Sequence, residues 1–98
     1  MTYEFVISTE AKQDIENAYA WYELRKDGLG YVFESNLEKA IESIKENPFA
    51  YQIKYDQVRV CFVSQFPFGL HYFIDGEMVR LVAVFHASRD PQKWFNRL

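Results

Sequence analysis

The chain has 98 residues, a net charge of -3 at pH 7, and a composition that is 49% hydrophobic, 18% aromatic and 26% charged. A chain of this length holds one domain at most, and it is too apolar to be disordered. Its single cysteine, Cys61, excludes an intrachain disulfide and a cysteine-based zinc site. The lone cysteine also fits a reducing compartment, so we expect a cytoplasmic protein. Because no run approaches the roughly 18 apolar residues of a membrane span, we expect no membrane association.

The two halves of the chain differ in charge. Residues 1–50 carry five basic and ten acidic residues, whereas residues 51–98 carry six and four, a net charge of -5 against +2. The acidic first half argues against a broad nucleic-acid footprint, while a local basic surface on the second half could contact phosphate. An ordinary solvated distribution of charge is the alternative.

A strand and two helices are expected in the first half. Residues 3–7 alternate with the period of two that is typical of a half-buried strand. Ser8 is expected to cap the next helix, because its hydroxyl can accept from the amides exposed at a helix start. Asp27-Gly28 interrupts the helical spacing, and Asn47-Pro48 ends a second helix that should pair antiparallel with the first. The apolar positions at helical spacing are Ala11, Ile15, Ala18, Tyr19 and Tyr22, then Phe33, Leu37, Ala40, Ile41 and Ile44.

After Pro48 the period changes to two, which predicts four strands. Turns are expected at residues 66–69 and at Asp75-Gly76, and Asp90-Pro91 should begin a short C-terminal helix. The fold class is therefore α+β, in the order β-α-α-β-β-β-β plus a short C-terminal helix, with an antiparallel helix pair packed on one face of a mixed, mainly antiparallel sheet. The alternating positions are Tyr51, Ile53 and Tyr55, then Val58, Val60 and Phe62, then Leu70, Tyr72 and Ile74, then Val79, Leu81, Ala83 and Phe85.

The second face of the later strands is neither clearly polar nor clearly apolar. Arg59, Cys61 and Val63 share one parity on one strand, as do Arg80, Val82, Val84 and His86 on another. Since one helical pair covers only one face of a sheet, the other face would expose apolar side chains unless a partner binds them. The alternative is that the valines pack under loops and the C-terminal helix. The candidate partner-binding residues are Arg59, Arg80, Val82, Val84, His86, Arg89, Trp94 and Arg97.

Metal-independent RNA cleavage, without a cofactor, is one chemistry open to these residues. His86 could act as acid or base, with Arg89 and Arg59 supplying fixed positive charge to the transition state. Arg80 is excluded from that group, since six strand residues at about 3.3 Å each place it roughly 20 Å from His86. No metal-ligand spacing is present. Ordinary structural roles remain the alternative for all four residues. His71 is expected to be a structural residue rather than a ligand, and the aromatic residues Tyr19, Trp21, Tyr22 and Trp94 are expected to anchor the core rather than stack on bases.

The whole chain resembles the RelE/ParE superfamily of type II toxins, which implies a single toxin domain over residues 1–98. The His-x-x-Arg-Asp-Pro ending is similar to the ParE-like, plasmid-stabilisation branch, whose characterised members poison DNA gyrase. The matching segments are Ser8-Thr9-Glu10-Ala11, Asp14-Ile15, Asn47-Pro48, Val58-Arg59, Phe66-Pro67-Phe68 with Tyr72, and residues 84–91 followed by Trp94 and Arg97.

The resemblance implies a growth-arresting toxin that inhibits gyrase and is bound by an antitoxin, whose extended or helical segment wraps around it. The alternative within the superfamily is a ribosome-dependent mRNA endoribonuclease. Those relatives often use a tyrosine near the C-terminus, whereas this chain has Phe95 and no tyrosine after Tyr72, and its pI of about 5.3 is low for a protein that docks on ribosomal RNA. A third possibility is a degenerate, non-toxic module that only binds antitoxin.

Overall fold

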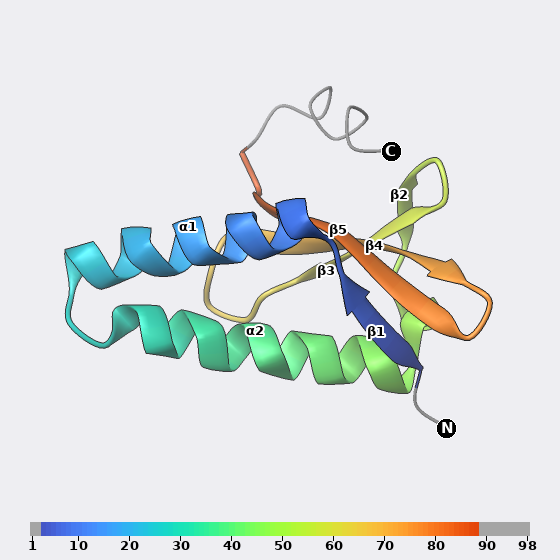
Figure 1. Ribbon diagram of the computed structural model, residues 1–98, viewed down its shortest axis with the longest axis horizontal. Helices are drawn as coiled ribbons and strands as arrows, with labels where there is room; N and C mark the ends of the chain where they lie inside the picture. Colours follow the sequence, from blue (N-terminus) through green and yellow to red (C-terminus); the bar gives the residue numbers. More distant parts are fainter. Residues whose placement is uncertain (1–2, 89–98) are drawn as a thin grey trace.

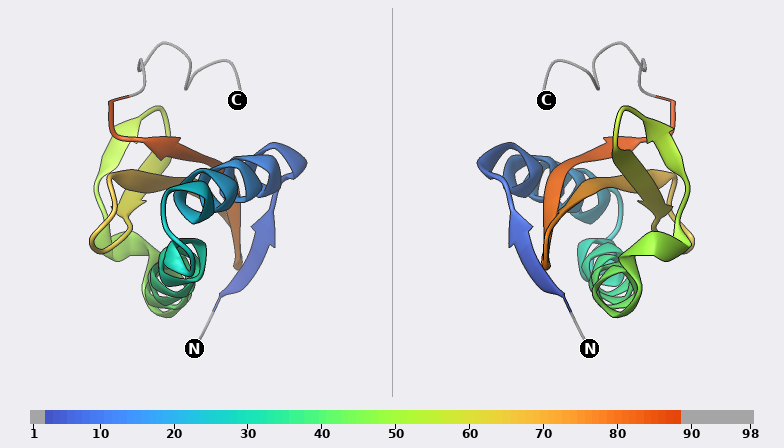
Figure 2. Two further views of the ribbon diagram at one scale, coloured as in Figure 1. Left: turned by 90° about the vertical axis from the view of Figure 1, so that its left-hand side faces the viewer. Right: turned by 90° about the vertical axis from the view of Figure 1, so that its right-hand side faces the viewer.

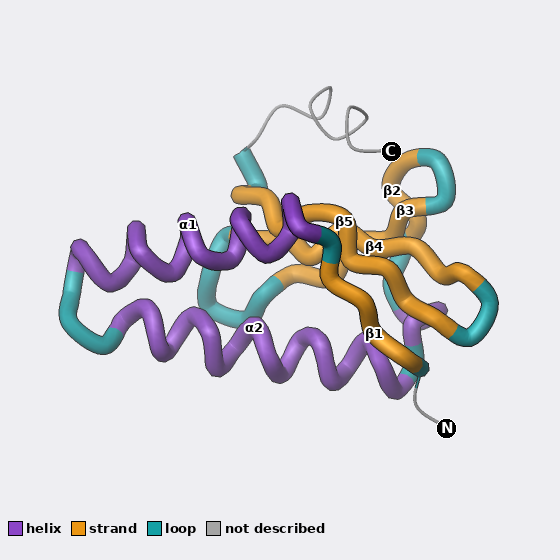
Figure 3. Tube along the Cα trace, in the orientation of Figure 1, coloured by secondary structure: helices purple, strands orange, loops and turns teal. Residues whose placement is uncertain are grey.

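The α+β class is confirmed by the computed structural model, which describes residues 3–88 (Figures 1 and 3). The predicted C-terminal helix at Asp90-Pro91 lies outside the described residues. The elements in chain order are β1 (Glu4–Ile7), α1 (Thr9–Arg25), α2 (Leu29–Glu46), the 3-10 turn η1 (Pro48–Ala50), β2 (Ile53–Tyr55), β3 (Val58–Phe62), β4 (Phe68–Asp75) and β5 (Met78–His86).

The five strands form one sheet in the order β1-β5-β4-β3-β2. β1 runs parallel to β5, and the other neighbouring strands are antiparallel, as expected for a mixed, mainly antiparallel sheet. The sheet curves around the helical pair, with β1 and β2 at its two edges (Figure 2). Both helices thus lie on one face of the sheet.

Local hydrogen bonds fix the ends of the helices. The Ser8 hydroxyl accepts from the Ala11 amide at 3.0 Å, which confirms the predicted cap. The Glu23 carboxylate accepts from the Gly28 amide at 2.8 Å and the Gly30 amide at 2.9 Å, so the end of α1 satisfies the exposed start of α2. Gly28 adopts a left-handed φ of 87°, a conformation that glycine reaches without strain. α2 ends where Asn47-Pro48 was expected to end it.

An aromatic cluster packs the helical pair against the strands. The ring of Phe33, on α2, is fully buried and lies 5.4 Å from Tyr22 and 5.2 Å from Phe66. Most of the predicted helical positions are buried, which confirms the spacing: Ala11, Ala18, Tyr22, Phe33, Leu37, Ala40 and Ile44. Trp21, expected to be a core residue, is instead 50% exposed.

Two strand boundaries differ from the sequence prediction. Tyr51 precedes β2 rather than belonging to it, and the pairing with β3 shifts register between Ile53 and Tyr55. Phe68 and Gly69, expected in a turn, are the first residues of β4. Phe68 therefore points into the core with the alternating residues of that strand rather than lying in a loop.

A register shift on β5 changes which side chains face the helices. Tyr72 lies opposite Leu81 and His71 lies opposite Ala83, so Val82 has no residue opposite it on β4. One extra residue in a strand moves the following side chains to the other face. The β5 residues in the core cluster beneath the helices are Val79, Leu81 and Val84.

Candidate functional site

The predicted partner-binding face is not a single surface. Cys61, Val63 and Val84 are buried in the core under the helices. Arg80 points to the opposite face, because its neighbours Val79 and Leu81 both face the helices. The prediction that side chains alternate without interruption along β5 was wrong. Because of the register shift at Val82, even-numbered residues before it face away from the helices, whereas even-numbered residues after it face towards them.

Arg59 has a structural role in the fold. Its guanidinium donates to the Tyr51 carbonyl at 2.6 Å and to the Phe49 carbonyl at 3.4 Å. The neighbouring Tyr72 hydroxyl donates to the Pro48 carbonyl at 2.6 Å, and burial raises the pKa of Tyr72. Burial likewise raises the pKa of the Cys61 thiol beside them. These contacts attach η1 to β3 and β4.

Among the predicted cationic residues within 3–88, Arg59 and His86 lie apart from each other. Arg59 is opposite Tyr72 on β4, whereas His86 is opposite Phe68. Phe68 and Tyr72 are four positions apart on β4, a distance of about 13 Å along the strand. Arg80 pairs with the Asp75 carboxylate at 3.0 Å, on a half-exposed surface. Of the remaining predicted site residues, Arg89, Trp94 and Arg97 lie outside the described residues.

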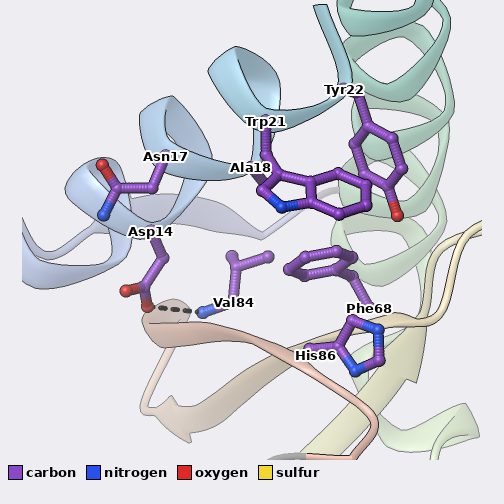
Figure 4. Close-up of a pocket in the computed structure, with 8 residues that line it drawn as sticks. All are labelled: Asp14, Asn17, Ala18, Trp21, Tyr22, Phe68, Val84 and His86. Carbon is purple, nitrogen blue, oxygen red and sulfur yellow. Dashed lines mark hydrogen bonds between the residues drawn. The ribbon is translucent and has the colours of Figure 1, made fainter. Parts of the chain in front are cut away.

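His86 lines an open groove between α1 and the ends of the strands (Figure 4). The groove has a volume of about 350 Å³. The His86 ring lies edge-on to Phe68 at 5.3 Å, and its Nδ1 is 2.8 Å from the Ser88 hydroxyl. The lining residues are Asp14, Asn17, Ala18, Trp21, Tyr22, Phe68, Val84 and His86.

The backbone of β5 explains why α1 lies along this groove. β1 ends at Ile7, opposite Leu81, so the edge of β5 continues beyond its parallel neighbour. The Ser8 hydroxyl donates to the Val82 carbonyl at 3.4 Å, and the Asp14 carboxylate accepts from the Val84 amide at 2.9 Å. Side chains at the start of α1 thereby bond the strand edge that β1 leaves open.

Sequence reasoning missed three groove residues on α1. Asp14, Asn17 and Trp21 follow one another at intervals of three and four, a second helical stripe beside the buried one. This spacing in the sequence could have indicated that the three side chains share one face of the helix. The resulting groove combines apolar side chains with the polar groups of Asp14, Asn17 and His86.

Residues 3–88 contain neither a metal-binding cluster nor a membrane-spanning helix. No three histidine, cysteine, aspartate or glutamate side chains in that range lie close enough together to hold a metal ion. Neither of the two long helices in the same range is apolar enough to cross a membrane.

The curved sheet, its helical pair and the open groove define a small α+β protein. The chain matches the family model described as "ParE toxin of type II toxin-antitoxin system, parDE" over residues 5–91, and it belongs to that family. This confirms the resemblance to the ParE-like branch. The chain is therefore the toxin of a type II toxin-antitoxin system, with a cognate antitoxin as partner.

A solved structure supports the fold. The chain is similar to one in a structure titled "Chromosomal ParDE TA system from P. aeruginosa", with 13% sequence identity and a TM-score of 0.71. The similarity covers 87% of this chain and 96% of that chain. No curated protein matches the sequence.

Proposed function

We propose that this toxin stabilises plasmids and arrests growth in the cytoplasm by binding and inhibiting DNA gyrase, without cleaving RNA. The observation that carries the proposal is the position of Arg59, which is bonded to backbone carbonyls about 13 Å along the sheet from His86. RNA cleavage needs an acid, a base and fixed positive charge around one phosphate. A toxin that acts by binding needs no such group.

The charge of the chain supports the same proposal. The net charge is -3, and the groove that contains His86 also contains the Asp14 carboxylate. Proteins that dock on RNA rely on basic residues to neutralise phosphates. An acidic chain is better suited to a protein surface than to the ribosomal A site.

Supercoiling by purified gyrase tests the proposal. Relaxed plasmid, gyrase and ATP are incubated with increasing amounts of the full toxin, and the supercoiled fraction is measured on a gel. We expect supercoiling to fall as toxin is added, and preincubation of the toxin with its antitoxin to restore it. Full supercoiling at a large molar excess of toxin, together with transcripts cut within codons after induction, would instead establish the endoribonuclease alternative.

We further propose that the groove beside α1 receives an apolar side chain of the antitoxin. Trp21 offers a half-exposed indole on one wall, while Ala18 and Val84 leave space between that wall and the strand. Partly exposed aromatic residues at the edge of an apolar pocket are typical anchors of protein interfaces. The Asp14 and Asn17 side chains at the rim can orient polar groups of the same segment.

Co-expression tests this binding site. Trp21→Asp removes the indole and adds a charge in the groove, so we expect antitoxin to rescue growth poorly from this variant. The matched control is Leu24→Asp, three residues along α1, where the side chain is 85% exposed and lies outside the groove. Equal rescue of Trp21→Asp and Leu24→Asp would rule the groove out as the antitoxin site.

A further inference from the structure

A second groove lies between α1 and α2, which run side by side (Figure 1). Both helices belong to residues 1–50, the part of the chain with a net charge of -5. We call it the hairpin groove. It has a volume of about 350 Å³ and is lined by Ile15, Glu16, Tyr19, Tyr31 and Glu34.

The hairpin groove and the groove that contains His86 lie on different sides of α1. Asn17 lines the groove that contains His86, whereas Tyr19 lines the hairpin groove. Two residues along a helix correspond to a rotation of about 200°. A side chain of a partner can therefore enter one groove without filling the other.

Two tyrosine rings form part of the wall of the hairpin groove. The rings of Tyr19 and Tyr31 meet edge to face, with their centroids 5.4 Å apart and their planes at 89°. Tyr31 is 65% exposed, so much of its ring is open to a partner. The face of an aromatic ring carries partial negative charge and attracts a cation.

Two carboxylates add negative charge to the same groove. Glu16 is exposed and Glu34 is partly buried, and no basic side chain of residues 3–88 forms an ion pair with either of them. The pKa of Tyr19 is raised to about 12 by its hydrogen bond with Tyr31, by burial and by nearby carboxylates that include Glu34. The Glu23 carboxylate, by contrast, is bonded to backbone amides at the start of α2. Glu16 and Glu34 are therefore available to a partner.

We propose that the hairpin groove binds an arginine side chain of the antitoxin, with the guanidinium against the Tyr31 ring and paired with the Glu16 and Glu34 carboxylates. The groove favours a cation, because its described lining holds two carboxylates and no basic residue. Its rings favour arginine over lysine, since the planar guanidinium stacks on aromatic faces and bonds a carboxylate with two donors. The antitoxin is the partner that membership of the family gives this chain.

This contact depends neither on the proposed inhibition of gyrase nor on the side chain proposed for the groove that contains His86. It gives the acidic half of the toxin a role in the choice of partner. A basic antitoxin segment would be attracted to the helical hairpin, whereas an acidic one would be repelled.

Titration calorimetry of the full toxin with its antitoxin tests the contact. The double variant Glu16→Gln, Glu34→Gln keeps the size of both side chains and removes both charges, so we expect the dissociation constant to rise about tenfold. The difference should shrink at high ionic strength. The matched control is Glu38→Gln, Glu46→Gln, which removes two charges from exposed positions of α2 outside the groove and should change affinity less than about twofold. Unchanged affinity of the first double variant would overturn the proposal.

Two replacements of Tyr31 separate binding by the ring from general attraction of charge. Tyr31→Phe keeps the aromatic face, so affinity should stay within about twofold of the wild type, whereas Tyr31→Leu removes the face and should weaken binding several-fold. Circular dichroism checks that both variants are folded. Equal affinity of the two variants would contradict stacking of the guanidinium on Tyr31.

Replacement of each antitoxin arginine by alanine identifies the side chain that occupies the groove. Every variant is titrated into the wild-type toxin and into Glu16→Gln, Glu34→Gln. We expect one arginine whose loss weakens binding to the wild type but not to the double variant, because its contact is already absent there. If no arginine shows this coupling, the antitoxin does not occupy the hairpin groove in the way proposed, and the proposal is wrong.

Discussion

Polar side chains at the two ends of the sheet have different surroundings. At the end near η1, the Arg59 guanidinium and the Tyr72 hydroxyl donate to backbone carbonyls of residues 48–51. At the opposite end, His86 and Asp14 line an open groove. A strand arginine is therefore a poor guide to function where a nearby turn exposes carbonyls that need donors. An open groove is the better guide.

Loss of the Tyr72 hydroxyl should have the largest effect on stability. Tyr72→Phe leaves the Pro48 carbonyl without its buried donor, so the free energy of unfolding should fall by about 1–3 kcal/mol. Urea denaturation followed by circular dichroism measures the change. His86→Gln, at the exposed end, should change it by less than about 0.5 kcal/mol. Equal losses in the two variants would break the distinction between the ends.

Replacement of Arg59 should have an intermediate effect. Arg59→Lys keeps the charge but lacks the planar guanidinium that reaches two carbonyls, so we expect a loss of about 1 kcal/mol. Arg80→Lys is the matched substitution in a solvent-exposed ion pair, where the loss should be about 0.5 kcal/mol or less. The same urea experiment compares them. A larger loss for Arg80→Lys than for Arg59→Lys would contradict the structural role given to Arg59.

Alkaline pH should reveal a smaller effect on the helical pair. The hydrogen bond with Tyr31, followed by burial and nearby carboxylates, raises the pKa of Tyr19 to about 12. Because the folded state favours the protonated phenol, this contribution to stability is fully present below pH 10 and is lost as the pH rises through about 12. A spectrophotometric titration of tyrosinate should show this late ionisation. Tyr31→Phe should return the pKa of Tyr19 towards its ordinary value. An unchanged titration in that variant would contradict the role of the hydrogen bond with Tyr31.

Local sequence signals predicted most of the fold. Helical spacing located the buried residues of α1 and α2, Ser8 marked the start of α1, and Asn47-Pro48 marked the end of α2. The family resemblance, carried by residues across the chain, identified the class of toxin. These features depend on neighbours in sequence, which is why they could be predicted without coordinates.

The site was harder to predict, because it depends on strand register. The register shift at Val82 inserts one residue into the alternation of β5 and turns Val84 towards the helices. No local sequence pattern predicts this change. Trp21 has the apolar character of a core residue, and its exposure follows from where α1 meets the end of β5. Only the pairing of distant segments settles both positions.

Growth after induction of His86→Gln, beside the wild type at equal soluble expression, tests most directly whether this toxin acts by binding. Glutamine keeps hydrogen-bonding groups in the groove but cannot serve as an acid or base near neutral pH. We predict that both chains arrest growth to a similar extent. Arrest by the wild type alone, with the variant still folded, would make His86 an acid or base and contradict the account. Normal growth with both would show a non-toxic module that only binds antitoxin.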